Sequence, residues 1–316
     1  MPQPTSSQVH VDAILTNISV AYMQNQNNFI ASRVFPIVPV AKQSDKFFTY
    51  TKNDWFRDEA QRRADATESA GGGYNLSTDS YHADVYAFHK DIGDQTRANA
   101  DSPINVDREA VEFVTSRLAL KMETQFVSNY FTTSVWGTDA TPSNLWDNYA
   151  TSDPLGDIET AKRTILSTTG FEPNTLVLGY DTFKALKNHP DLVDRIKYTS
   201  SQIITESLMA SLFDVPRVFV AKAVKATNNE GATGAYSFTH GKHALLTYSA
   251  PSPGLLQPSG GYVMSWTGVS QGLGATVGTS RIRMEQFKAD RVEAEIAFDM
   301  KVIGSDLGYF FNSCVS

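Results

Sequence analysis

Apolar residues recur at helical spacing between residues 106 and 131 and predict the longest helix of the chain. One set stands at every fourth position: Val106, Ala110, Val114, Leu118, Met122, Phe126 and Tyr130. Phe113, Leu120 and Val127 widen this apolar face, as on a helix that packs against a core. At 1.5 Å per residue the helix would be roughly 39 Å long, far above the usual three turns. We therefore expect it to be the spine of a domain.

Apolar and polar residues alternate near the C-terminus and predict a long strand. In RVEAEIAFDMKVI (291–303), one face carries Val292, Ala294, Ile296, Phe298, Met300 and Val302. The segment RIRMEQF (281–287) alternates in the same way, and the turn Lys288-Ala289-Asp290 joins the two. A period of two is typical of a strand with one buried face. The pair predicts a long hairpin with one face in solvent.

A second hairpin is predicted earlier in the chain. RVFPIVPV (33–40) is expected to be an edge or irregular strand because of its prolines, and KFFTYT (46–51) and 79–92 to be strands. Residues 57–78 between them hold one large aliphatic residue, Leu76, and one aromatic residue, Tyr74. Such a segment is a phosphate-binding loop, a disordered linker, or an arm that becomes ordered against another subunit.

From residue 151 the pattern alternates between helices and strands. A helix is expected to start at Asp157 and to end before Gly170, followed by a buried strand over 174–180. Further helices and strands follow up to residue 266, and 228–234 is a surface turn. Residues 1–33 are polar, with either a short helix near 10–22 or an arm that packs on a neighbour. The fold class is α+β.

Composition narrows the possible functions. The chain has 316 residues, of which 41% are hydrophobic and 19% charged, as in a globular protein. Its formal net charge is −7, which argues against a main task of gripping nucleic acid phosphates. The single cysteine excludes an internal disulfide and a cysteine-rich zinc site. With no signal peptide and no apolar run of about 18 residues, we expect a soluble intracellular protein.

Each sequence motif that could indicate catalysis or ligand binding lacks a part that its chemistry needs. GLGATVG (272–278) is close to a dinucleotide fingerprint, but a strand follows it where a helix is needed. HGKH (240–243) lacks further metal ligands, so we expect solvated turn histidines. GGGYNLST (71–78) has no phosphate-binding lysine, and the arginines nearby are offset by carboxylates. We expect no catalytic residue, no metal and no cofactor.

The segment most similar to a known family is NTLVLGYDTFKALKNHPDLVDRIKY (174–198), a strand that leads into a helix ending at HP. Around it stand a polar N-terminal arm, a hairpin with a charged, glycine-containing tip, one long helix, an α/β insertion and a final hairpin. This order of parts resembles the major capsid proteins of tailed bacteriophages over nearly the whole chain. These proteins share the Hong Kong 97-type fold.

The resemblance implies a division of the chain into parts. These are an N-terminal arm (1–33), an extended loop hairpin with its base (34–99), a peripheral domain with the spine helix (100–150), an axial domain (151–270), the long hairpin of the peripheral domain (271–303) and a C-terminal return to the axial domain (304–316). It implies inter-subunit contacts at Trp55, Arg57, Arg62, Arg63, Tyr74, Lys288 and Asp290. It also implies a hinge or tip at Gly71, Gly72 and Gly73.

The resemblance implies a structural function without enzyme activity. The chain is expected to self-assemble into pentamers and hexamers of an icosahedral shell that encloses double-stranded DNA without sequence-specific binding. Expected partners are a portal protein and separate scaffolding and decoration proteins, with assembly in the host cytoplasm and no membrane contact. Two alternatives stay open: an encapsulin-like compartment shell, and an α/β enzyme with an unrecognised site in 151–270.

Overall fold

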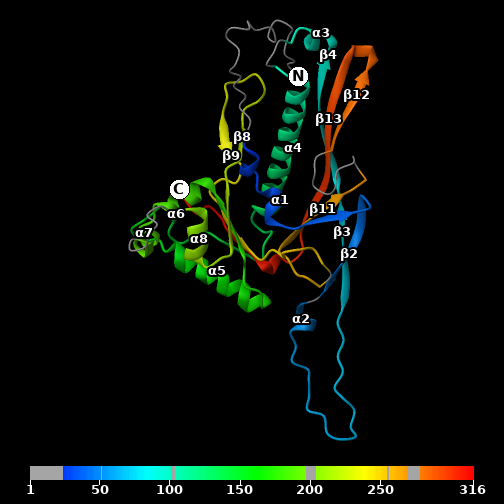
Figure 1. The fold of residues 1–316 in the computed structure, drawn as a ribbon. Helices are drawn as coiled ribbons and strands as arrows, with labels where there is room; N and C mark the ends of the chain where they lie inside the picture. Colours follow the sequence, from blue (N-terminus) through cyan, green and yellow to red (C-terminus); the bar gives the residue numbers. More distant parts are fainter. Residues whose placement is uncertain (1–23, 51, 101–103, 197–203, 255, 269–277) are drawn as a thin grey trace.

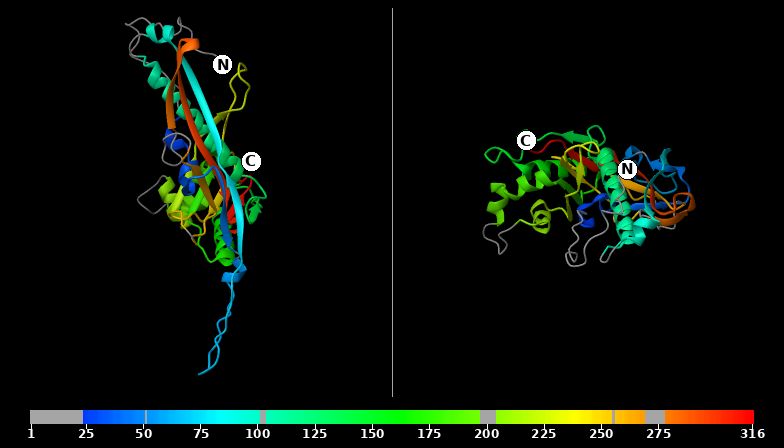
Figure 2. Two further views of the ribbon diagram at one scale, coloured as in Figure 1. Left: turned by 90° about the vertical axis from the view of Figure 1, so that its right-hand side faces the viewer. Right: turned by 90° about the horizontal axis from the view of Figure 1, so that it is seen from above.

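The computed structural model describes residues 24–50, 52–100, 104–196, 204–254, 256–268 and 278–316. The predicted helix near 10–22, most of the N-terminal arm 1–33, and all but the last residue of the GLGATVG stretch lie outside these residues. The molecule is elongated: a thin hairpin arm extends from one end of a long sheet, and a helical unit lies beside the sheet (Figure 1, Figure 2).

The long sheet has β13 at its centre. One edge of β13 pairs with β4, and the other edge pairs first with β12 and then with β11, which also holds β1 in parallel. The strands are β1 (Ile37–Val40), β4 (Asp84–Gly93), β11 (Gly261–Trp266), β12 (Gly278–Met284) and β13 (Ala289–Val302). β13 is the expected long strand, and β1 with its proline lies at the edge of the sheet as expected.

The predicted spine helix is confirmed as α4 (Val106–Tyr130), a helix of 25 residues. Asn105 caps it, since its side-chain oxygen accepts the N–H of Arg108 at 3.0 Å. The apolar residues at every fourth position are all buried. They pack on one face of β13, where Val292, Ala294, Ile296 and Phe298 are buried as well. Burial of this stripe holds α4 along the sheet.

Strand pairing closes into a ring where the arm leaves the body. β2 (Ser44–Tyr50) follows β1 and pairs with β3 (Leu76–His82), and β3 continues into β4 after Ala83. The pairs β1–β11, β11–β13 and β13–β4 complete the circuit. A small cluster with Tyr81, Tyr262 and Met264 is buried at this ring. The arm is therefore attached to a closed arrangement of strands.

A second unit is built on a five-stranded sheet. Its strands, in spatial order, are β5 (Thr138–Ala140), β14 (Gly308–Phe311), β10 (Ala244–Thr247), β6 (Thr175–Gly179) and β7 (Arg217–Ala221). The helices that accompany it are α5 (Pro154–Thr169), α6 (Tyr180–Lys187), α7 (Pro190–Ile196) and α8 (Glu206–Phe213). Its core is a cluster of its own around Trp146 and Leu176. The hairpin β8 (Val224–Ala226) and β9 (Tyr236–Phe238) extends from this unit, with 228–234 exposed at its end except for half-buried Asn228.

Three expectations about local structure were wrong. The start of RVFPIVPV is not extended, because α1 (Ala31–Val34) occupies it before Phe35 and Pro36 turn the chain into β1. The helix expected to start at Asp157 starts at Pro154, since Asp153 accepts the N–H of Gly156 and a proline fits the first helical position.

The third concerns the turn between β12 and β13. It is made by the short 3-10 helix η2 (Glu285–Phe287) and Lys288, whose φ of 47° is left-handed. Ala289 and Asp290 already belong to β13, and both are buried. The expected turn over 288–290 is therefore displaced toward the N-terminus.

Candidate assembly surfaces

The arm, defined here as residues 52–75, projects beyond β2 and β3, and its contacts with the body lie near its base. Every residue from 55 to 80 is exposed, and Figure 1 shows the arm extending away from both units. Its base is held by polar contacts. The carboxylate of Asp54, in α2 (Lys52–Trp55), accepts the N–H of Asn75 at 2.8 Å, and Lys52 forms an ion pair with Asp306 of η3 (Ser305–Leu307). The arm is thus tied at its root and free along its length.

An exposed aromatic cluster marks the base of the arm. The ring centroids of Tyr50, Trp55 and Tyr74 lie 5.6–6.1 Å apart. Trp55 is 52% and Tyr74 62% exposed, and Phe48 and Phe56 beside them are each 59% exposed. In proteins generally, large exposed apolar patches mark interaction sites. The predicted contact residues Trp55 and Tyr74 meet here.

The chain reverses direction at Ala64–Thr67, not at the glycines. The Thr67 hydroxyl donates to the Ala64 carbonyl at 2.8 Å, and Ala66 has a φ of 59°. Gly71–Gly73 lie on the returning branch, where a Cβ on Gly71 or Gly73 would meet nothing within 4 Å. The predicted arginines 57, 62 and 63 are exposed. The Arg57 guanidinium is 3.6 Å from the Glu59 carboxylate, and the Arg63 side chain donates to the Thr67 carbonyl.

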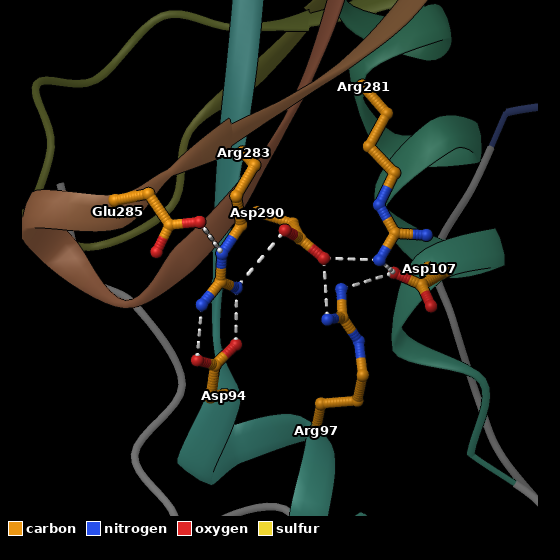
Figure 3. A network of polar contacts seen from close by, with 7 residues as sticks. All are labelled: Asp94, Arg97, Asp107, Arg281, Arg283, Glu285 and Asp290. Carbon is orange, nitrogen blue, oxygen red and sulfur yellow. Dashed lines mark hydrogen bonds and ion pairs between the residues drawn. The ribbon is translucent and has the colours of Figure 1, made fainter.

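A network of charged side chains lies at the opposite end of the molecule, where α3 (Asp94–Ala98), the start of α4 and the β12–β13 turn meet (Figure 3). Asp290 is at its centre. It accepts hydrogen bonds from Arg97 at 2.6 Å, from Arg281, and from Arg283 at 3.2 Å. Arg283 also binds Asp94 through two nitrogens at 2.6 and 2.7 Å. Asp107 and Glu285 complete the set.

The guanidiniums of Arg281, Arg97 and Arg283 hold the pKa of Asp290 well below its ordinary value, and the hydrogen bond from Arg281 has the largest effect. Asp290 is buried and spends its oxygens inside its own chain, whereas Lys288 is exposed at the turn. Lys288 and Asp290, both implied by the resemblance as contact residues, therefore differ in their surroundings. The network fixes the shape of this end of the molecule through fork-like arginine contacts.

A serine–histidine–aspartate cluster elsewhere in the chain has the wrong proton positions for catalysis. His189 Nε2 is 2.9 Å from Ser152 Oγ, and Nδ1 is 3.7 Å from the Asp191 carboxylate. The Ser152 hydroxyl donates to the Asn148 carbonyl, and the Asp191 N–H donates to Nδ1. Nε2 therefore carries the proton and donates to Ser152, so the imidazole has no free nitrogen to activate the serine. Ser152 and His189 are buried, Asp191 is exposed, and the His189 ring caps the start of α7.

The expectation of solvated histidines in HGKH was wrong. His240 is 1% exposed, with its ring centroid 5.8 Å from that of Phe126 and 4.7 Å from that of Phe131, and His243 is half-buried. The reason is that the turn after β9 folds onto α4 rather than into solvent. Its neighbour Glu123 was also missed, although it is fully buried. Its position three residues after Leu120 and four before Val127, within the widened apolar face, is the signal that could have found it.

The surface hollows and the acidic, histidine and cysteine side chains of the described residues indicate no further ligand site. Two surface hollows of about 360 and 350 Å³ both lie at the charged end, against β4 and β12. Within the described part of the chain, no group of three or more His, Cys, Asp or Glu residues is placed to hold a metal ion. None of the described helices is both long and apolar enough to span a membrane.

The curated proteins similar in sequence to this chain include major capsid proteins of phages. No family model matches the sequence. The chain is 27% identical to the major capsid protein of Burkholderia phage BcepMu, over 96% of both chains. It is 25% identical to the major capsid protein of Pseudomonas phage JBD67, over 97% of both.

Solved structures share the fold. A phage-related protein from Bordetella bronchiseptica RB50 matches with a TM-score of 0.70 and 24% identity, over 92% of this chain and 94% of that one. The capsid of cyanophage P-SCSP1u matches with a TM-score of 0.61 at 9% identity, over 95% and 92%. An encapsulin from Synechococcus elongatus PCC 7942 matches with 0.60 at 11%, over 95% and 93%. With a projecting arm, a spine helix on a long sheet and capsid proteins as its relatives in sequence, the chain is a structural major capsid protein of the tailed-bacteriophage type, with the Hong Kong 97-type fold.

Proposed function

We propose that the chain assembles into pentamers and hexamers of a closed icosahedral shell that encloses double-stranded DNA. The observation that carries this proposal is the arm. Its aromatic base is exposed in the single chain, and an exposed apolar cluster of this kind is stabilised by burial against a partner. Because one chain type must close rings and then a shell, the partner is another copy of the same chain.

The parts of the chain take the following roles in this proposal. Residues 1–33 form an N-terminal arm and 34–99 the extended loop with its base. Residues 100–150 and 271–303 form the peripheral domain, which α4 and β13 support. Residues 151–270 form the axial domain around the five-fold and six-fold positions, to which 304–316 return. β14 supports this return, since it pairs with β10 and β5, whereas β11 pairs with β13 across the proposed boundary.

Contacts between subunits are proposed at both ends of the molecule. At the arm, Trp55 and Tyr74 supply apolar contact area, and Arg57, Arg62 and Arg63 supply ion pairs that select register more than affinity. Gly71–Gly73 act as a hinge on the returning branch. At the charged end, exposed Lys288 contacts neighbours, and Asp290 contributes by holding Arg97, Arg281 and Arg283 in place.

Further partners follow from the role of a phage capsid. A portal protein and separate scaffolding and decoration proteins bind the shell, and assembly takes place in the host cytoplasm. The net charge of −7 suits a shell that encloses DNA without gripping it. The Ser152–His189 cluster is a helix cap, which supports a structural rather than an enzymatic role.

Assembly of the purified chain tests the proposal. We expect size-exclusion chromatography and negative-stain electron microscopy to show rings or shells, alone or with the scaffolding protein encoded beside it. A chain that stays monomeric in both conditions contradicts the proposal.

Deletion of Ala64–Gly73 tests the arm. We expect a folded chain with an unchanged circular dichroism spectrum that no longer forms particles, because the deleted residues make no contact with the body. Glu109→Gln, an exposed change on α4 outside the arm, is the control and should assemble. Particles from the deleted chain would refute the role of the arm.

An encapsulin-like compartment that holds cargo proteins is the second candidate, because the encapsulin fold matches over 95% of this chain. Genes for a terminase and a portal beside the coding sequence favour the phage capsid, and a cargo enzyme favours the compartment.

A further inference from the structure

A buried carboxylate joins the spine helix to the start of α1. Glu123 of α4 is fully buried. Its Oε2 accepts the N–H groups of Ile30 and Ala31, at 3.0 and 2.9 Å. These are orphan donors at the start of α1, and Ile30 supplies no cap of its own. A side chain 92 residues away in sequence therefore caps this helix.

The second oxygen of the carboxylate has no hydrogen-bond donor. Glu123 Oε1 is buried without a partner, 3.6 Å from Nδ1 of His240. Nδ1 lies 3.0 Å from the Thr239 hydroxyl, which itself donates to the carbonyl of Ala223. Nδ1 therefore carries the hydrogen and donates to Thr239, while Nε2 is buried without a partner. Glu123 Oε1 and His240 Nε2 are thus two buried acceptor atoms that receive no hydrogen bond from the described residues. This makes the pair the least satisfied polar site of the described core.

The groups that face this pair come from several elements. From the turn between β9 and β10 come His240 and, next to it, His243, which disfavours a charge on His240. α1 presents only its N–H groups, since the Arg33 guanidinium lies 5.1 Å from the Phe219 ring centroid of β7. On α4 itself the residues one turn away from Glu123 are apolar: Ala119, Leu120, Phe126 and Val127. Among the described residues, no cation shifts the pKa of Glu123; burial raises it, and the N–H groups of Ala31 and Ile30 lower it.

Charge decides what such a pair does. With a neutral imidazole, an ionised Glu123 leaves one uncompensated negative charge in the core, which is costly. One added proton makes the pair neutral, whichever group holds it. We propose that Glu123 and His240 form a proton-controlled latch, which holds residues 24–34 on α4 while the pair carries this proton and loosens them when it is lost.

Burial raises the pKa of Glu123 to about 7, against the two N–H bonds that lower it. Opening of α1 would let water reach the carboxylate and return its pKa toward the ordinary 4.5. The closed form binds the proton more tightly, so opening becomes easier as the pH rises through about 7. The inference concerns the single chain and does not depend on shell assembly.

The segment has few other polar attachments. The Gln24 side chain donates to the Val224 carbonyl at 2.6 Å and accepts its N–H at 2.9 Å. Ser249 donates to the Val34 carbonyl at 2.6 Å. Both attachments are uncharged and do not titrate, so among the described residues the pH response of this segment belongs to Glu123.

Hydrogen exchange of the full chain at pH 5.5 and pH 8 tests the latch. Rates for peptides that contain Ile30 and Ala31 are divided by the intrinsic exchange rates at each pH. We expect local opening to increase about 30-fold, from a Glu123 pKa of 4.5 when open and about 7 when closed. Peptides from β13 should show a smaller change, because opening of α1 leaves that strand paired.

Glu123→Gln keeps the two N–H bonds and cannot titrate, so its protection at Ile30 and Ala31 should not change with pH. Glu109→Gln, an exposed change on the same helix, should behave as the native chain does. Native protection that is independent of pH, or a Glu123→Gln chain that loses protection as the native one does, overturns the proposal. The first outcome needs no variant, so poor folding of Glu123→Gln leaves the proposal testable.

Discussion

Substitution of Glu123 and substitution of His240 should make the free energy of unfolding depend on pH in opposite directions over the same pH range. Burial raises the pKa of Glu123 from 4.5 to about 7. Its contribution to stability is therefore complete below 4.5 and is lost as the pH rises through 7. At 1.36 kcal/mol per pKa unit, the loss is about 3 kcal/mol.

His240 acts in the other direction. Burial lowers its pKa from 6.5 to about 3, so its contribution is complete above 6.5 and is lost as the pH falls toward 3. Between pH 6.5 and 4.5 this loss is about 3 kcal/mol. In the native chain, folding releases one proton from His240 and takes up one at Glu123, so within this window the two effects cancel.

Urea unfolding followed by circular dichroism at pH 4.5, 5.5, 6.5 and 7.5 measures the two terms separately. Relative to the native chain, Glu123→Gln should lose about 3 kcal/mol as the pH falls from 6.5 to 4.5, because only the histidine term remains. His240→Phe should lose about 3 kcal/mol as the pH rises from 4.5 to 7. Differences from the native chain remove the contributions of other carboxylates, and Glu109→Gln serves as control. If the free energy of unfolding changes with pH in the same direction in both variants, the assignment of both groups to a site without water is refuted.

Three further predictions concern other parts of the chain. Asp290→Asn should lower the melting temperature at pH 7, because three guanidiniums lose their shared anion, and the gap to the native chain should shrink as the pH falls below about 4, where Asp290 in the unfolded chain becomes protonated. Equal gaps at pH 7 and pH 3 would contradict this. Trp55→Ala should change the free energy of unfolding by less than about 0.5 kcal/mol but reduce particle formation in electron micrographs. Gly308→Ala should cost about 1–3 kcal/mol in urea unfolding, because its Cβ would collide with the Trp136 ring, whereas Gly71→Ala should be neutral.

Local periodicity was a reliable guide where one face of an element is buried along its length. α4 matched its predicted bounds to within one residue, and β13 carried the expected buried face. Errors occurred where a few residues change direction. α1 was missed because four residues are too short for a helical period, and the β12–β13 turn was displaced because Lys288 adopts a left-handed φ that no local pattern announced.

The sequence by itself determined the long elements with one buried face, the shortage of apolar residues over 57–78 and the resemblance to phage capsid proteins, because these depend on spacing, on composition and on the order of parts. Only the tertiary structure decided how single polar residues are used. Asp290 and Arg97 meet across 193 positions of the chain, and Glu123 and Ile30 across 93. The burial, pKa and partners of such groups depend on which distant segments pack on them, and no local pattern records that packing. The sequence therefore indicates the polar segment that forms the arm, but it does not predict the network around Asp290 or the Glu123–His240 pair.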